Sequence, residues 1–182
     1  MKDDEVLIGG IEKVDIKIVD YQPHWFEMFE QHRRKIKNAL GPEALQIEHI
    51  GSTSVPELAA KPIIDIVVVV NDSADEGSYL QPLLDAGYQL RVREPLFFEH
   101  RMVRTPERDV HIHIFSAGCQ EVERYLLLRN YLRVNPEARS EYETIKRKFA
   151  QRSWEDMNAY AQAKTDFIEN LIRLARESKI QI

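Results

Sequence analysis

IEHIGSTSVPELAAKPIIDIVVVV, residues 47–70, decides the fold of this chain. An apolar strand ends in Gly51-Ser52, a short turn follows, and a run of β-branched residues then carries one aspartate, Asp65. A buried strand tolerates a carboxylate only when another group pairs with it, because desolvating an unpaired charge is very costly. Asp65 therefore lies either at a strand end that faces a site, where it would suit Mg²⁺, or beside Lys61 or a nearby arginine that holds the turn.

The length and composition fit one globular domain. The chain has 182 residues, of which 43% are hydrophobic and 30% charged, and its formal net charge is −5. This charge argues against an extended nucleic-acid surface, but it is compatible with a local basic pocket for a phosphorylated small molecule. One cysteine, Cys119, excludes an internal disulfide and fits a reducing compartment. No secretory signal is visible and the run 63–70 is too short to span a bilayer, so we expect a cytoplasmic protein with no membrane partner.

Helical and strand patterns alternate along the first two thirds of the chain. A helical pattern covers 23–40 and stops at Gly41-Pro42. Ser73 with Glu76 matches a capping box and predicts a helix that ends at Gly87. Strands are predicted where β-branched and aromatic residues gather between turn signals, over 45–50, 63–70, 88–92, 98–104 and 110–115, with a loop at 93–96 and the last two strands paired.

The last third of the chain is predicted to be helical. Three apolar patterns at helical spacing cover 121–134, 137–152 and 153–175, separated by Pro136 and by Ser153 as an expected N-cap. No internal repeat or long linker divides the chain, so a single domain is expected over 1–182. A helix, a β-rich middle and a helical end together predict an α+β, or mixed α/β, domain.

Two histidines share one face of the predicted strand 110–115. Successive side chains of a strand point to opposite faces, so His111 and His113 lie together and away from the apolar residues between them. His49 and His100 belong to the same β-rich middle. Neutral imidazole binds transition metals and serves as a general acid or base near neutral pH. A solvated strand face would show the same alternation, but we favour a site.

Groups suited to phosphate gather near the same segments. The turn at Gly51-Ser52 offers backbone N–H groups and a hydroxyl, although a plain strand-to-helix turn with Ser52 or Thr53 as N-cap would look the same. Arg101 and Arg104 lie on a predicted strand, and the arginine fork matches phosphate and carboxylate geometry. As a cluster beside Asp65, these residues indicate an anionic substrate.

The central stretch resembles the signature of the GrpB family. Residues 47–56 and 58–66 carry the resemblance, and further matches occur at 21–25, 100–104, 111–113, 129–133 and 160–168. The resemblance covers about 14–170 and implies the fold of nucleotidyltransferases related to DNA polymerase β, with a central mixed sheet flanked by helices. The chain departs from the family pattern at Glu57, Val110 and Asn130, where the family commonly has glycine, histidine and aspartate.

Active nucleotidyltransferases of this fold place a Gly-Ser turn beside two carboxylates two residues apart, with a third on a later strand. Here Ile63 and Val67 flank Asp65 at the two-residue spacing, so only one carboxylate of that pair is present. The apolar run after Asp65 favours the second position of the pair over the first. Histidines stand on the strand where the third carboxylate is expected.

The resemblance implies a protein that binds a nucleotide or other phosphorylated small molecule with a divalent metal, and that transfers a nucleotidyl group if it is an enzyme. The metal, Mg²⁺ or Mn²⁺ with a transition metal as the alternative, is expected at Asp65, His111 and His113, which are also the expected catalytic residues. Substrate or phosphate contacts are expected from Gly51, Ser52, Thr53, Lys61, Arg101 and Arg104, with His49, His100, Arg129 and Lys164 as further candidates.

Two other functions stay open. Members of the family are also found fused to dephospho-CoA kinase, so the resemblance allows a non-catalytic accessory module with enzymes of coenzyme A biosynthesis as partners. The histidines also allow a metal hydrolase that reuses the scaffold, with an open coordination position for water.

Overall fold

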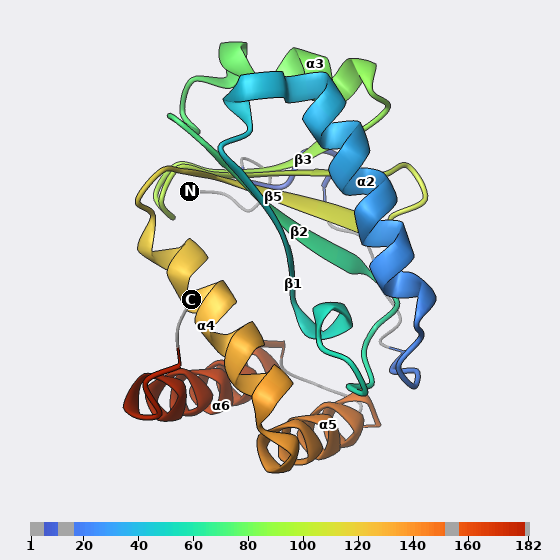
Figure 1. The fold of residues 1–182 in the computed structure, drawn as a ribbon, viewed down its shortest axis with the longest axis vertical. Helices are drawn as coiled ribbons and strands as arrows, with labels where there is room; N and C mark the ends of the chain where they lie inside the picture. Colours follow the sequence, from blue (N-terminus) through green and yellow to red (C-terminus); the bar gives the residue numbers. More distant parts are fainter. Residues whose placement is uncertain (1–5, 11–16, 152–156, 181–182) are drawn as a thin grey trace.

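A five-stranded mixed sheet forms the centre of the computed structural model, which describes residues 6–10, 17–151 and 157–180 (Figure 1). The strands, in the order β1-β2-β5-β4-β3 across the sheet, are β1 (Gln46–Ile50), β2 (Ile64–Val70), β5 (Val110–Ser116), β4 (His100–Arg104) and β3 (Gln89–Glu94). β2 and β5 run parallel, and the other neighbouring strands are antiparallel. The mixed sheet and the pairing of β4 with β5 confirm the predictions.

Helices cover both faces of this sheet. They are α2 (His24–Leu40), α3 (Leu80–Asp85), α4 (Gln120–Val134), α5 (Pro136–Ala150) and α6 (Met157–Glu177). Figure 1 shows α2 and α3 on one side of the sheet, and α4, α5 and α6 gathered on the other. We call these sides the α2 face and the α4 face. The described part of the chain contains no helix with the length and apolarity needed to cross a membrane.

The alternation along β2 explains why its sequence is apolar almost throughout. Ile64, Ile66 and Val68 belong to the core under α2 and α3, whereas Val67 belongs to a separate core against α4. A strand covered on both faces needs apolar residues at nearly every position. Asp65 has the same parity as Val67, so it points to the α4 face.

The predicted capping box at Ser73 and Glu76 is wrong. The Ser73 hydroxyl lies 2.9 Å from the Ser116 hydroxyl, and the Glu76 carboxylate accepts hydrogen bonds from Arg93 and Arg101. These tertiary contacts occupy both side chains, and the chain forms a short 3-10 turn, η3 (Glu76–Ser78), before α3 begins.

Other boundaries follow the sequence closely. Gly87 ends the α3 segment as predicted, with φ of 93° and its N–H on the Leu84 carbonyl. β3 continues through Glu94, which pairs with His100 on β4, so the loop predicted at 93–96 starts later than expected. The C-terminal third is helical as predicted, and the expected cap at Ser153 lies outside the described residues.

Candidate functional site

A glycine brings the end of β1 into contact with the aspartate of β2. Gly51 has φ of 70° and ψ of −177°, a conformation open essentially to glycine alone. A Cβ at Gly51 would lie 2.8 Å from the Asp65 Oδ2 atom, closer than any real contact of this kind. The turn therefore needs glycine for its backbone angles and for the space that the Asp65 carboxylate occupies.

Asp65 faces two histidines that lie on the neighbouring strand, β5. It is the second residue of β2, its side chain is 32% exposed, and its register partner on β5 is His111. The Asp65 Oδ1 atom lies 3.4 Å from His113 Nε2 and 3.7 Å from His111 Nδ1. One oxygen and two ring nitrogens of these residues all lie within 4.8 Å of one another, so the three side chains form a group able to hold a metal ion.

The surroundings of His111 favour its neutral ring, which is the form that binds metals. Burial lowers the pKa of His111 below its ordinary value; the Asp65 carboxylate opposes this effect, and the charges of His113, Arg104 and Lys61 add to it. A neutral imidazole has a lone pair to offer, whereas an imidazolium has none.

His113 belongs to a row of polar contacts that joins β5, β4 and β3. Its Nδ1 atom lies 3.1 Å from His100 Nε2, and His100 Nδ1 lies 2.6 Å from the Glu94 carboxylate. Burial, together with the charge of His113, lowers the pKa of His100 to about 4, although Glu94 opposes the shift. His100 therefore does not touch Asp65, but it contacts a residue that does.

Two cavities meet at Asp65. One, of about 330 Å³, extends from Asp65 and His113 toward α4 and α6, and we call it the apolar cavity. Its lining includes the aliphatic residues Leu128, Leu132, Ile168 and Ile172, and charged residues at Glu121, Arg124 and Arg129. The other, of about 250 Å³, extends past His111 to Lys61 and Lys146, and we call it the lysine cavity. Ser52, Asp65 and Tyr142 line both cavities. A ligand placed across Asp65 would meet apolar groups on one side and lysines on the other.

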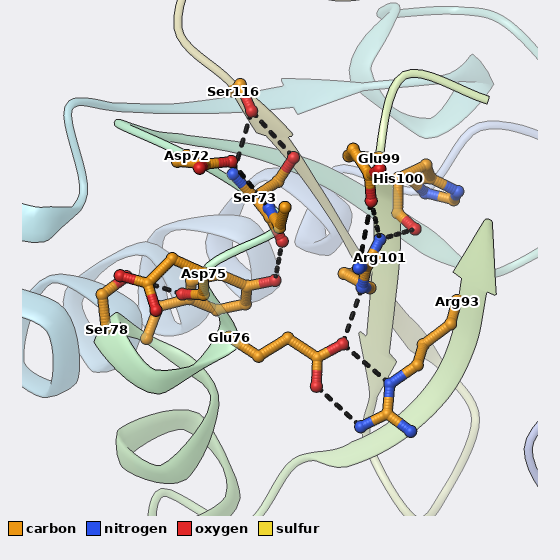
Figure 2. A network of polar contacts seen from close by, with 12 residues as sticks. Asp72, Ser73, Asp75, Glu76, Ser78, Arg93, Glu99, His100, Arg101 and Ser116 are labelled. Atoms are coloured by element: carbon orange, nitrogen blue, oxygen red, sulfur yellow. Dashed lines mark hydrogen bonds and ion pairs between the residues drawn. The ribbon is translucent and has the colours of Figure 1, made fainter. Parts of the chain in front are cut away.

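The structure does not bring Arg101 to this group. Arg101 is 6% exposed and points to the α2 face, where its guanidinium donates to Glu76 Oε1 at 2.7 Å and to Glu99 at 3.2 Å. Figure 2 shows Arg101 and Arg93 converging on Glu76, while the His100 ring points away from them. Neighbouring residues on one strand thus serve opposite faces of the sheet.

His49 and the Thr53 hydroxyl are also occupied elsewhere. The His49 ring stacks on Phe29 of α2, and its Nε2 atom lies 3.0 Å from the Thr53 hydroxyl. That hydroxyl donates to the Ile63 carbonyl, which fastens the turn to the start of β2. Burial lowers the pKa of His49 to about 4, so this histidine is neutral at neutral pH.

The remaining predicted residues are Arg104, Lys61, Arg129 and Lys164. Arg104 is the register partner of His111, and Lys61 lines the lysine cavity. Arg129 lines the apolar cavity but donates to the Glu48 carboxylate and to the His49 carbonyl at 2.7 and 3.0 Å. The Lys164 side chain lies outside what the structure describes.

Several lining residues were not predicted from the sequence. Tyr142 and Lys146 come from α5, where the Lys146 ammonium lies 4.6 Å from the centre of the Tyr142 ring. Nothing in the local pattern of α5 distinguishes them from ordinary helical residues. Glu94 was assigned to a loop, and only its pairing opposite His100 across the hairpin could have indicated its role.

Comparison with known proteins identifies the family. A family model described as GrpB protein matches residues 15–173. A UPF0157 protein of Streptomyces coelicolor is 52% identical over 162 residues, which cover 89% of this chain and 85% of the relative. A protein of Mycolicibacterium paratuberculosis named dephospho-CoA kinase is 27% identical over 191 residues, covering 91% of this chain and 47% of that protein. The chain belongs to the GrpB family.

Solved structures identify the fold. The crystal structure of conserved protein GrpB from Enterococcus faecalis matches with a TM-score of 0.77 and 36% identity, covering 89% of this chain and 98% of that chain. Cid1, an RNA terminal uridylyl transferase, matches with a TM-score of 0.54 over 75% of this chain and 42% of its own, at 13% identity. One structure of Cid1 holds MgGTP. The nucleotidyltransferase fold implied by the resemblance is confirmed, and at this identity the likeness to Cid1 concerns the fold alone.

Proposed function

We propose that this GrpB family chain binds a nucleotide or another phosphorylated small molecule together with a divalent metal ion, and that it transfers a nucleotidyl group. The observation that carries the proposal is the group of Asp65, His111 and His113 beside the Gly51-Ser52 turn, where the two cavities meet. A fold neighbour that holds MgGTP supports a nucleotide as the ligand.

The donor set supports Mn²⁺ or a transition metal over Mg²⁺. Magnesium prefers oxygen ligands, whereas imidazole suits transition metals, and a carboxylate with two imidazoles leaves coordination positions open for a ligand. Asp65, His111 and His113 are the residues that would hold the ion. When bound, the ion would polarise phosphate oxygens and neutralise the charge that develops on them.

In this proposal the two cavities hold different chemical parts of a phosphorylated ligand. Lys61 and Lys146 line the lysine cavity together with Ser52, and ammonium groups and a hydroxyl suit phosphate oxygens. The apolar cavity suits the organic part of the ligand, because Leu128, Leu132 and other aliphatic side chains form part of its lining. Tyr142 stands between the two parts. The reacting phosphate would then lie beside Asp65, where both cavities open.

Binding measurements on the full chain test this proposal. Nucleoside triphosphates are titrated by calorimetry with Mn²⁺, with Mg²⁺ and with EDTA, and turnover is followed by release of pyrophosphate. We expect metal-dependent binding that Asp65→Asn abolishes and that Asp85→Asn leaves unchanged, since Asp85 is an exposed residue of α3 bonded to Gln81. Neither binding nor turnover with any triphosphate and either metal would sink the proposal.

A non-catalytic binding module is the second candidate. It is favoured by the carboxylate count: Val67, two residues beyond Asp65, is fully buried and apolar. A relative named dephospho-CoA kinase, of which this chain covers 47%, supports a role near coenzyme A biosynthesis. Binding of dephospho-CoA or a nucleotide that EDTA does not change, without turnover, would favour this candidate. Metal-dependent turnover would exclude it.

A metal hydrolase is favoured by the same two imidazoles that argue against magnesium. It requires a stoichiometric transition metal and a coordination position kept for water. Metal analysis of protein purified without a histidine tag is followed by phosphoester hydrolysis assays. These assays separate it from nucleotidyl transfer, because a hydrolase passes the phosphoryl or nucleotidyl group to water, whereas a transferase leaves the nucleotidyl group on an acceptor.

A further inference from the structure

We propose that Glu94 and His100 position His113 for metal binding, by fixing which nitrogen of the His113 ring carries the proton. The inference rests on the metal site proposed above and extends it by two residues that are not themselves ligands. Both act through hydrogen bonds, so we treat them as positioning residues.

The three side chains form one continuous row across neighbouring strands. Glu94 lies on β3, His100 is its register partner on β4, and His113 lies on β5. The Glu94 carboxylate lies 2.6 Å from His100 Nδ1, His100 Nε2 lies 3.1 Å from His113 Nδ1, and His113 Nε2 lies 3.4 Å from Asp65 Oδ1. Each histidine in the row uses both ring nitrogens.

The two histidine rings meet edge to edge rather than face to face. Their planes differ by 14° and their centroids lie 5.2 Å apart. That separation is close to the 3.1 Å between the facing nitrogens plus the two ring radii. Such a relation holds only when each nitrogen points along its ring plane at the other, which is the geometry of a hydrogen bond.

The carboxylate sets the direction of the whole row. An ionised carboxylate only accepts hydrogen bonds, so His100 Nδ1 must carry hydrogen and donate to Glu94. In a neutral ring the second nitrogen then has no hydrogen, and His100 Nε2 accepts from His113 Nδ1. His113 Nε2 is left with its lone pair. This is the nitrogen and the form that a metal requires. Because the Asp65 Oδ1 atom, 3.4 Å away, also only accepts hydrogen bonds, this tautomer belongs to the chain with a metal ion bound.

The environment of His100 holds this arrangement in place. His100 is 6% exposed, Phe115 stacks on its ring with centroids 4.7 Å apart, and the Phe97 ring meets it edge-on at 6.1 Å. Water therefore has little access to substitute for either partner.

The row of hydrogen bonds is tested by comparing the metal affinities of two variants at His100. His100→Phe fills the aromatic surroundings but removes the acceptor, and loss of such an outer partner typically weakens metal binding roughly 10–100-fold. His100→Gln keeps an acceptor oxygen for His113 and should retain most of the affinity. The control is His32→Phe, which removes a histidine bonded to the Tyr88 hydroxyl at 2.7 Å, from α2 on the other face. Calorimetric titration of the full chain with Mn²⁺ gives the affinities.

The tautomers are read directly from the unmodified chain. With ¹⁵N-labelled histidine and bound Zn²⁺, we expect His113 to be protonated at Nδ1 and metal-bound at Nε2, and His100 to be protonated at Nδ1 only. A His113 ring that is bound through Nδ1 or protonated at Nε2 would overturn the inference, even if His100→Phe fails to fold. So would a folded His100→Phe that binds Mn²⁺ as tightly as wild type. Wild-type protein that binds neither metal would instead remove the metal site itself, and with it this inference.

Discussion

Polar side chains enclosed on the α2 face and the polar side chains that surround Asp65 on the α4 face are held in different ways. On the α2 face, Arg101 and His49 are enclosed and make short contacts, at 2.7 Å to Glu76 and 3.0 Å to the Thr53 hydroxyl. On the α4 face, the Asp65 carboxylate is partly exposed and its contacts to His113 and His111 are longer, at 3.4 and 3.7 Å. Buried polar groups in a scaffold are satisfied within the protein. Loosely paired groups beside two cavities are left available to a ligand.

The largest expected effect comes from breaking the network on the α2 face. Glu76→Ala leaves Arg101 buried with only Glu99 as a carboxylate partner, and breaking a buried pair costs about 3–5 kcal/mol of unfolding free energy. Urea unfolding measures the loss, and Mn²⁺ affinity should stay unchanged. Glu177→Ala, which removes an exposed pair with Arg173, is the control and should change stability little. Equal losses in the two variants would contradict the comparison.

The second largest effect is a fall in unfolding free energy at acid pH, caused by His49 on the α2 face. Burial lowers the pKa of His49 from 6.5 to about 4 in the folded chain. The unfolded chain therefore takes up the proton first as pH falls, and stability drops between pH 6.5 and 4, by up to roughly 3 kcal/mol for this group. Urea unfolding from pH 7 to 4.5 should show a shallower fall in His49→Gln than in wild type. Parallel curves would show that His49 is not the group responsible.

The third effect tests the contact between the two strands at the site. Gly51→Ala places a residue in a backbone region open to glycine, at a cost of order 1–3 kcal/mol. It also forces the Asp65 carboxylate aside, so metal binding should be lost. Gly118→Ala is the matched control, because Gly118 also has positive φ, at 78°, but a Cβ there meets nothing within 4 Å. If both variants keep metal binding, the Asp65 position is not needed for it.

Local sequence patterns were sufficient to predict the strands, the helical C-terminal third and the position of His111 and His113 on the same face of one strand. The strand period also placed Asp65, His111 and His113 together once β2 and β5 are neighbours. Arg101 shows where this reasoning stopped: it lies one residue from His100, and a shift of one residue exchanges the faces of a sheet. The register of β4 depends on its partners, including an irregularity in β3 between Leu90 and Val92.

Contacts between distant segments explain the remaining differences. Ser73 and Glu76 have the local signature of a helix start, but partners on β3, β4 and β5 outcompete it. Tyr142 and Lys146 reach the site because α5 packs beneath the turn after β1, a tertiary arrangement that helical periodicity does not encode. The sequence thus predicted residues that lie near Asp65 along neighbouring strands, and missed those delivered by packing.

The smallest effect on stability, with the largest consequence for function, is expected from Asp65→Asn. If Asp65 is a ligand at a partly exposed position, the amide fits the same space and the melting temperature of the metal-free chain should hardly change. Functional groups are often not optimal for stability, so a slight increase is also consistent with the ligand role. The stabilisation by Mn²⁺ and nucleotide should disappear, because a ligand stabilises only the state that binds it. Thermal melts with and without both additions decide between these roles, with Asp85→Asn as the control.

A loss of roughly 3–5 kcal/mol of unfolding free energy without metal would instead identify Asp65 as half of a structural ion pair. The α4 face would then be scaffold like the α2 face, and the contrast between them would fail.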